Sequence, residues 1–287
     1  MTEAAKHWLN RPQEPWIRFE KETDTQLDPF GRAVLAKLEP KPGERALDIG
    51  CGTGQTLLQL AELVGPEGHV LGVDISETML GRARERVREA GVLQVSTELD
   101  NAELYAFSQR SFDLLFSRFG VMFFEDSVRA FRNFAGALRP RARLGFVCWQ
   151  KREKNQWAQV LLDAVLPLMP TAELPPLLAP GRPGPFYFGD PDFARKILVE
   201  AGFDQVTLDP VEMPLHFGGA MTLEAAADYA MFIGPASLVI AEADPAFYPK
   251  FHAALTEALS PFVTERGCWL GGAVWLVSAR RGGKSVV

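Results

Sequence analysis

Four residues spaced two apart, Asp48, Gly50, Gly52 and Gly54, are the first candidates for chemistry in this chain. They follow a short apolar strand and precede an apolar-periodic helix, so the glycines lie on a strand-to-helix turn. Glycine permits positive φ there and lets a ligand lie against bare backbone. A dinucleotide fingerprint beginning at Gly50 would need glycine where Gln55 stands, and the Gly-Lys-Ser/Thr of a P-loop does not follow. Because an acid in the turn repels a pyrophosphate, the pattern favours a ligand with positive charge.

This Asp-x-Gly-x-Gly-x-Gly turn resembles the first motif of the class I S-adenosylmethionine-dependent methyltransferases. That cofactor carries an ammonium and a sulfonium and no phosphate, which is compatible with an acid in the turn. The resemblance implies that the cofactor is bound by Asp48, Gly50, Cys51, Gly52 and Gly54, with Cys51 as a small residue beneath it. The alternative is a tight turn whose glycines serve packing alone.

A second acid, Asp74, ends the next predicted strand. It lies twenty residues beyond Gly54, about where an α/β nucleotide site places the carboxylate that accepts both ribose hydroxyls. Ile75 can cover one face of an adenine, and Ser76 is a good helix N-cap. Met79 lies one turn into that helix, on the side of the cleft. A second N-cap is the alternative role for Asp74.

The residues Asp100, Asn101 and Ala102 follow the third predicted strand. In the methyltransferase family an Asp-Ala pair at this place reads the adenine edge. Counted back from Phe107, the family's acid aligns with Asn101, and Asp100 falls one position early. The resemblance therefore implies cofactor contacts by Asn101 and Ala102, although either Asp100 or Asn101 can be the adenine contact. A plain turn is the alternative for both residues.

The loop after the fourth strand begins at Ser117 and is rich in aromatic residues. Ligands of open parallel sheets bind outside the carboxyl ends of the strands, so this loop is expected to form a wall of the site. The resemblance implies that a backbone carbonyl near Ser117 accepts from the methionine ammonium. We predict a substrate pocket formed by aromatic residues of this loop and of the N-terminal segment. Its members are Trp16, Phe19, Phe119 and Phe123. Ordinary core packing is the alternative for each of them. The loop also resembles a bacterial small-molecule subgroup related to the ubiquinone and menaquinone methyltransferases.

Five strand–helix units up to Trp149 predict one doubly wound sheet, and the remainder of the chain completes it. The predicted class is α/β, a doubly wound, seven-stranded, mainly parallel sheet of the Rossmann-like methyltransferase fold, with an antiparallel last strand and a helical lid. The later elements are expected as helices near 126–138, 154–168, 191–201, 222–232 and 245–262, and strands at 92–97, 144–149, 203–211 and 269–279. Arg141 and Ala142 stand where the family has Gly-Gly, so that turn is expected to differ in geometry or to tolerate strain.

We divide the chain into an N-terminal lid segment (1–40), a cofactor-binding core (41–150) and lid helices that also complete the sheet (151–287). These parts form a single catalytic domain in our interpretation. A proline-rich crossing from 167 to 185 belongs to the lid, because a stiff loop of that length is usually functional or disordered.

The net charge of -6 argues against nucleic acid as a partner, since binding to phosphates depends on clustered Lys and Arg. The sequence shows no signal peptide and no apolar run that could span a membrane. Its three scattered cysteines are typical of reduced thiols, so we expect a cytoplasmic protein that acts on a small-molecule substrate. The oligomeric state stays open.

Candidates for a metal site or a general base are few. The four histidines form no i,i+4 pair, and Glu125 and Asp126 are the only paired acids near the fourth strand, where helix capping explains Asp126. We therefore expect no metal. His216 is the candidate base, with packing or surface exposure as its alternative.

The sequence thus predicts an S-adenosylmethionine-dependent methyltransferase that acts on a small, largely apolar acceptor, aromatic or lipid-like. S-adenosylhomocysteine would be the second product. The competing interpretation is a protein that binds these cofactors without catalysis, as a regulator or partner subunit.

Overall fold

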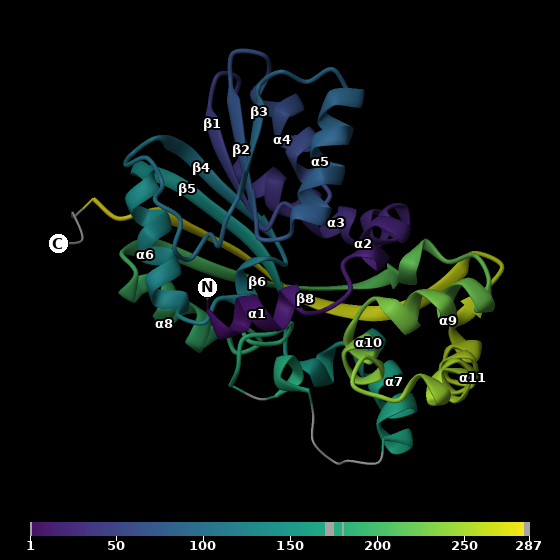
Figure 1. Ribbon diagram of the computed structural model, residues 1–287. Helices are drawn as coiled ribbons and strands as arrows, with labels where there is room; N and C mark the ends of the chain where they lie inside the picture. The colour runs from purple at the N-terminus through teal and green to yellow at the C-terminus, as the bar shows by residue number, and fades with distance from the viewer. Residues whose placement is uncertain (1, 170–174, 180, 284–287) are drawn as a thin grey trace.

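The computed structural model of the protein describes residues 2–169, 175–179 and 181–283. Figure 1 shows a twisted sheet with helices on both faces and further helices at one end of its longest strands. The strands are β1 (Arg45–Ile49), β2 (His69–Asp74), β3 (Val95–Leu99), β4 (Phe112–Arg118), β5 (Leu138–Trp149), β6 (Phe203–His216), β7 (Val263–Thr264) and β8 (Gly267–Arg281). The α-helices are α1 (Glu3–Leu9), α2 (Glu14–Arg18), α3 (Glu20–Leu38), α4 (Gln55–Val64), α5 (Glu77–Glu89), α6 (Ser127–Ala137), α7 (Gln156–Val165), α8 (Pro191–Glu200), α9 (Leu223–Phe232), α10 (Pro235–Ile240) and α11 (Tyr248–Leu259).

The strand order across the sheet is β3-β2-β1-β4-β5-β8-β6. The first five strands of this path are parallel to one another, and β8 runs antiparallel to both of its neighbours. The predicted doubly wound, mainly parallel sheet with an antiparallel last strand is therefore confirmed. An eighth strand, the two-residue β7, pairs only with β8 and was not predicted.

Helices α3, α4 and α5 cover one face of the sheet, and α6 and α8 cover the other (Figure 1). Helix α4 buries Leu57, Leu60 and Val64 completely, at the spacing that places them on one side of a helix. The two predicted N-caps are confirmed. The Ser76 hydroxyl accepts from the Met79 amide at 3.2 Å, and the Asp126 carboxylate accepts from the Arg129 amide at 2.9 Å.

The predicted starts of β3 and β5 are wrong. Strand β3 begins at Val95 rather than at residue 92, because pairing with β2 starts there and Leu93 is 94% exposed. Strand β5 begins at Leu138 rather than at residue 144, because it already pairs with Phe112 at its start. Arg141 has a φ of 65° in this stretch, so the turn that lacks Gly-Gly places a side-chain-bearing residue in the left-handed region.

Strands β6 and β8 are longer than predicted and extend beyond the rest of the sheet as an antiparallel pair. Helices α9, α10 and α11 lie between them in the chain, and α7 packs against α10 and α11. We call α7, α9, α10 and α11 the helical insert. Residues 170–174 and 180 of the predicted proline-rich crossing lie outside the described residues. Among the described helices, none combines the length and apolarity that a membrane crossing requires.

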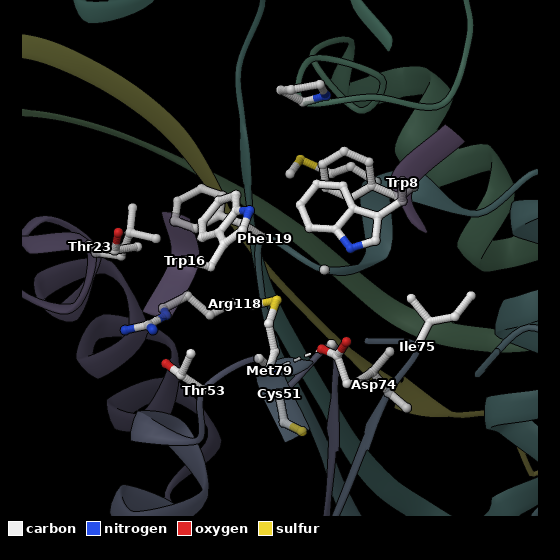
Figure 2. Close-up of a pocket in the computed structure, with 18 of the residues that line it drawn as sticks. Trp8, Trp16, Thr23, Cys51, Thr53, Asp74, Ile75, Met79, Arg118 and Phe119 are labelled. Carbon is white, nitrogen blue, oxygen red and sulfur yellow. Dashed lines mark hydrogen bonds between the residues drawn. The ribbon is translucent and has the colours of Figure 1, made fainter. Parts of the chain in front are cut away.

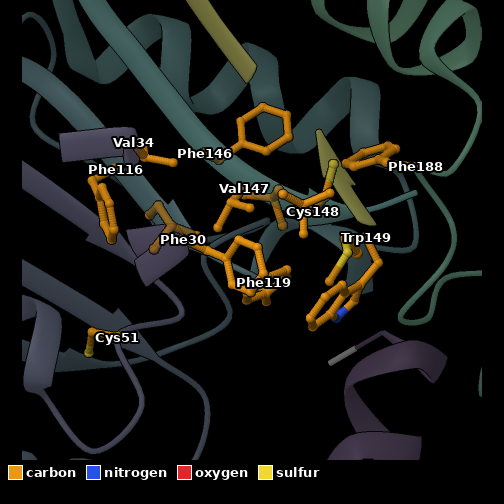
Figure 3. Packing of buried hydrophobic residues seen from close by; sticks show 14 of the residues in the cluster. Phe30, Val34, Cys51, Phe116, Phe119, Phe146, Val147, Cys148, Trp149 and Phe188 are labelled. Atoms are coloured by element: carbon orange, nitrogen blue, oxygen red, sulfur yellow. The ribbon is translucent and has the colours of Figure 1, made fainter. Parts of the chain in front are cut away.

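An aromatic cluster fills the space between α3 and the carboxyl ends of β4 and β5 (Figure 3). Phe119 stacks on Trp149 with ring centroids 4.3 Å apart, and Phe30 meets Phe119 edge-on at 5.9 Å. This packing fixes the loop after β4, so that the start of the loop has a defined position at the edge of the sheet.

Candidate active site

A cavity opens at the carboxyl ends of β1, β2 and β4, and most of the predicted site residues line it. Figure 2 shows Cys51, Asp74 and Met79 on one side of this cavity and the rings of Trp8, Trp16 and Phe119 on the other. The N-terminal segment and helix α10 contribute the remaining walls. The predicted residues that line the cavity are Trp16, Gly50, Cys51, Gly52, Asp74, Ile75, Met79, Asn101, Ala102, Phe119 and Phe123.

The glycine turn exposes backbone to the cavity, as its sequence predicts. Gly50 has a φ of 70°, and a Cβ there would lie 3.0 Å from the Cα of Gly120 in the loop after β4. The Gly50 amide donates to the carbonyl of Val73 at 2.9 Å, which joins the turn to β2. Burial raises the pKa of the Cys51 thiol well above its ordinary value, so this sulfur stays protonated and is not a nucleophile.

Asp74 connects the turn to the start of α5. One carboxylate oxygen accepts from the Gly52 amide at 2.8 Å and the other from the Ser76 amide at 2.9 Å. Burial raises the pKa of this carboxyl, and these backbone donors oppose the rise. Each oxygen keeps lone-pair capacity toward the cavity, which is what a ribose diol requires. Ile75 and Met79 lie beside it as predicted (Figure 2).

Three predicted cofactor residues do not line the cavity: Asp48, Gly54 and Ser117. The Asp48 carboxylate is fully buried beneath the turn and accepts from the Thr56 hydroxyl at 2.5 Å. Gly54 has a φ of 88°, and a Cβ there would lie 2.9 Å from the Cβ of Ala83, so this glycine lets α4 and α5 pack. The Ser117 hydroxyl donates to the carbonyl of Ile49 at 2.7 Å and joins β4 to β1. The Asp48 carboxylate therefore supports the turn from below instead of contacting the cofactor, and Gly54 serves helix packing. The predicted contact near Ser117 is a backbone carbonyl and not the hydroxyl, so it stays a prediction.

Both Asp100 and Asn101 line the cavity, so the structure leaves the adenine contact open. The Asp100 carboxylate accepts from the Asn101 amide at 2.7 Å. The Asn101 side chain accepts from the Glu103 amide at 3.0 Å and donates to the Thr2 hydroxyl at 3.4 Å. This segment and α1 are therefore in contact at the same end of the cavity.

The aromatic wall joins the N-terminal segment to the loop after β4. Trp8 lies 5.6 Å from Trp16 and 5.2 Å from Phe123, measured between ring centroids. Phe19 does not line the cavity, which corrects its assignment to the substrate pocket. Its ring instead packs edge-on against Tyr229 at 5.6 Å, inside the contact between the N-terminal segment and α9.

Sequence reasoning missed a buried charged group at the cavity edge. The Arg118 guanidinium donates to Asp24 at 3.3 Å and also to the side chain of Gln55. Asp24 accepts from Arg86 at 2.9 Å. Arg118 was part of the aromatic-rich loop segment, but its partner Asp24 lies 94 residues away on α3, so only tertiary structure could pair them.

The comparisons with known proteins concern the same segment. A family model described as a methyltransferase domain matches residues 46–141, which hold the glycine turn, Asp74 and the Asn101 segment. Aklanonic acid methyltransferase DauC of Streptomyces sp. (strain C5) is 41% identical over 118 residues, covering 41% of this chain and 54% of that protein. Residues 46–141 therefore match a methyltransferase domain, and this part of the chain is similar in sequence to small-molecule methyltransferases.

Other relatives are similar over comparable lengths. Nocamycin O-methyltransferase of Saccharothrix syringae is 32% identical over 62% of this chain and 65% of its own length. Demethylmenaquinone methyltransferase of Listeria welshimeri is 36% identical over 45% of this chain and 55% of its own length. The chain therefore spans about half to two thirds of the length of the curated relatives it matches.

Solved structures show the same fold at low sequence identity. Phosphoethanolamine N-methyltransferase 2 of Haemonchus contortus, solved with S-adenosylhomocysteine, gives a TM-score of 0.55 at 19% identity and covers 88% of this chain and 52% of that one. The [4+2]-cyclase SpnF gives a TM-score of 0.55 at 18% identity, covering 90% of this chain and 82% of the cyclase.

The residues that line the cavity fit S-adenosylmethionine. Gly52 has a φ of 55°, a conformation that favours glycine, so backbone without a side chain lines the cavity at this position. The Asp74 carboxylate faces the same space, and no backbone turn of the phosphate-binding type is present at residues 48–56. The residues that would hold the cofactor are Gly50, Cys51, Gly52, Asp74, Ile75, Met79, Asn101 and Ala102.

His216 does not line the cavity, which corrects its assignment as a base. It ends β6, stacks on Trp269 with ring centroids 4.7 Å apart, and its Nε2 lies 3.2 Å from the carbonyl of Ala220. The predicted strand ended at residue 211, and the longer strand carries this side chain past the sheet. Packing, the alternative role named above, accounts for these contacts.

The described residues do contain one group with metal-ligand chemistry, away from the cavity. Glu224 and Asp228 on α9 and His252 on α11 bring their ligand atoms within 4.8 Å of one another. The Nε2 of His252 lies 3.2 Å from the Asp228 carboxylate, so an ordinary surface hydrogen bond explains the arrangement. Glu125 and Asp126 serve the backbone instead. Glu125 accepts from the Ala4 amide at 3.1 Å, and Asp126 caps α6.

Proposed function

We propose that this methyltransferase transfers the methyl group of S-adenosylmethionine to a small, largely apolar acceptor, aromatic or lipid-like. The single observation that carries the proposal is the continuity of one cavity. The same space is bounded by the glycine turn and Asp74 and by the rings of Trp8, Trp16 and Phe119. Pockets for small organic ligands are mostly apolar with few polar groups, and this wall has that character.

The bound cofactor supplies a methyl carbon already activated by a sulfonium, so the protein's task is to align the acceptor and exclude water. Asp74 would hold the ribose, and the segment at Asn101 the adenine. The aromatic wall would hold the acceptor against the methyl group. The N-terminal segment and the helical insert act as a lid in this proposal, since both contribute walls to the cavity.

No histidine is among the described residues that line the cavity. The acids that line it are already engaged: Asp24 with two arginines, Asp74 with backbone amides, Asp100 with the Asn101 amide, and Glu103 with Arg129. In this proposal the acceptor brings a nucleophile that is ionised or readily ionised, and no protein base removes its proton.

Names of the relatives support a small-molecule acceptor. Aklanonic acid and nocamycin methyltransferases are named for small organic molecules, and demethylmenaquinone methyltransferase for a quinone. For this chain, that acceptor class is part of the proposal.

Two measurements test the proposal. Calorimetry with S-adenosylhomocysteine should show saturable binding, and incubation of methyl-labelled S-adenosylmethionine with a metabolite extract should place label in a small apolar product identified by mass. Failure to bind S-adenosylhomocysteine would refute the cofactor site. Binding without turnover across extracts and defined acceptors would favour the regulatory protein instead, and a strongly preferred sugar or nucleic acid acceptor would refute the apolar pocket.

A further inference from the structure

Arg11 introduces a positive charge into the aromatic wall of the cavity. It lies between α1 and α2 and lines the same space as Trp8 and Trp16. Its guanidinium carbon is 5.9 Å from the centre of the Trp8 ring, and its Nη2 donates to the Ser237 hydroxyl of α10 at 3.0 Å. The arginine therefore contacts both the N-terminal segment and the helical insert.

Among the described lining residues, only two are cationic, Arg11 and Arg118. Arg118 is paired with the Asp24 carboxylate at 3.3 Å. No carboxylate of the described part of the chain lies within ion-pair distance of Arg11, and its Nε is buried without a hydrogen-bond partner. The charge of Arg118 is thus compensated by the Asp24 carboxylate, whereas no carboxylate of the described residues is paired with Arg11.

A buried guanidinium without a paired carboxylate costs free energy, because its charge is removed from water. Burial lowers the pKa of Arg11 to about 10, while the exposed carboxylate of Glu242 acts from a distance in the opposite direction. At neutral pH the guanidinium is still protonated, so the apolar wall holds a cation whose desolvation is only partly offset. A ligand anion would offset it.

From these contacts we infer that the acceptor carries an acidic group, ionised at neutral pH, that binds to Arg11 while its apolar body lies against the aromatic wall. This inference rests on the proposed function and narrows its acceptor class to aromatic or lipid-like acids. Planar guanidinium groups bind carboxylates with two parallel hydrogen bonds, which fixes the orientation of the ligand as well as its position.

The cofactor's own carboxylate is the other anion that the site would hold. The side-chain contacts of Arg11 are with Trp8 and Ser237, and none is with the glycine turn or Asp74. The charged pair Arg118–Asp24, by contrast, adjoins Thr53 of the turn through Arg86. These contacts place Arg11 on the acceptor's side, and the experiment below separates the two anions.

The test uses the full chain saturated with S-adenosylhomocysteine and titrated in a calorimeter with 2-naphthoate and with the uncharged 2-naphthamide. We expect the wild type to bind the acid at least tenfold more tightly than the amide. Arg11→Met keeps the apolar stem and should abolish this preference, whereas Arg11→Lys should keep part of it. Arg18→Met is the matched control, because the Arg18 guanidinium lies over Phe19 and Phe232 and does not line the cavity.

A purely structural role for Arg11 gives a different pattern. If Arg11 only links the N-terminal segment to α10, Arg11→Met should lower thermal stability and leave the ratio of the two affinities unchanged. We expect stability at or above that of the wild type, with the ratio reduced to about one. Equal affinities in the wild type, no binding of either probe, or a preference that survives Arg11→Met would each overturn the inference.

Titration of the wild type and of Arg11→Met with S-adenosylhomocysteine separates a failure of this inference from a failure of the proposed function. Unchanged affinity for S-adenosylhomocysteine in Arg11→Met is expected, and a selective loss of that affinity would assign Arg11 to the cofactor carboxylate and overturn the inference. Absence of S-adenosylhomocysteine binding in the wild type would refute the proposed function itself.

Discussion

Asp48 should make the stability of the cofactor-free protein depend on pH. Its carboxyl is completely buried, one oxygen accepts from Thr56, and the other has no hydrogen-bond partner. Burial raises the pKa of Asp48 from the ordinary value of 3.8 to about 7, and the Thr56 hydroxyl and the charge of Arg118 oppose this rise.

The sign of the effect follows from proton linkage. The folded pKa is above the unfolded pKa, so between pH 3.8 and about 7 the unfolded chain releases a proton that the folded chain retains. The free energy of unfolding therefore falls as pH rises through this window and stays lowered above it. Since each pKa unit is worth about 1.4 kcal/mol, the rise corresponds to a loss on the order of 4 kcal/mol.

Asp48→Asn removes the titrating group and keeps an oxygen that can accept from Thr56. We expect the difference in unfolding free energy, variant minus wild type, to grow by about 4 kcal/mol between pH 4 and pH 8. Urea denaturation of both proteins across this range measures the difference, in which the contributions of other titrating groups cancel. Thr56→Val is the companion variant. It removes the hydrogen bond that stabilises the carboxylate, so the loss of stability should extend to higher pH. A difference that does not vary with pH would refute the reasoning.

Four further outcomes are expected. Asp74→Ala should weaken S-adenosylhomocysteine binding at least tenfold in calorimetry, because the two lost charge-assisted hydrogen bonds are each worth roughly 1.5–3 kcal/mol; unchanged affinity in a folded variant would sink the ribose assignment. Asn101→Leu should weaken binding more than Asp100→Leu, and the reverse order would move the adenine contact by one residue. Activity should survive EDTA, so a loss restored by a divalent ion would contradict metal independence. Trp16→Ala should raise the acceptor KM about tenfold or more, since burial of a large apolar side chain is worth about 1.5–3 kcal/mol, and should leave cofactor affinity unchanged; an unchanged KM would remove Trp16 from the acceptor wall.

The cofactor half of the site could be predicted from the sequence because its signals are local. A glycine turn between a strand and a helix, followed by an acid at the end of the next strand, lies within 27 consecutive residues, 48 to 74. Adjacent parallel strands place their carboxyl ends at one edge of a sheet, so the chain order alone brings Gly52 and Asp74 together. Their hydrogen bond of 2.8 Å follows from that arrangement.

The sequence was misleading for residues whose side-chain type suits ligand binding but whose position in the fold keeps the side chain away from the ligand. Asp48 has the polarity expected of a ligand contact, yet its carboxylate is fully buried and accepts from the Thr56 hydroxyl. Phe19 and His216 were assigned from their places in the chain. Their actual partners, Tyr229 and Trp269, lie in segments whose positions the sequence did not fix.

The sequence by itself determined the fold class, the resemblance to methyltransferases and the position of the glycine turn. The reason is that hydrophobic periodicity, turn residues and motif spacing act over short stretches of chain. Only the tertiary structure decided what surrounds the acceptor. The ion pair of Asp24 with Arg118, the contact of Arg11 with Ser237 and the approach of Trp8 to Phe123 join residues 94, 226 and 115 positions apart. Such contacts depend on how α1, α3 and the helical insert pack against one another, and no local pattern in the chain encodes that packing.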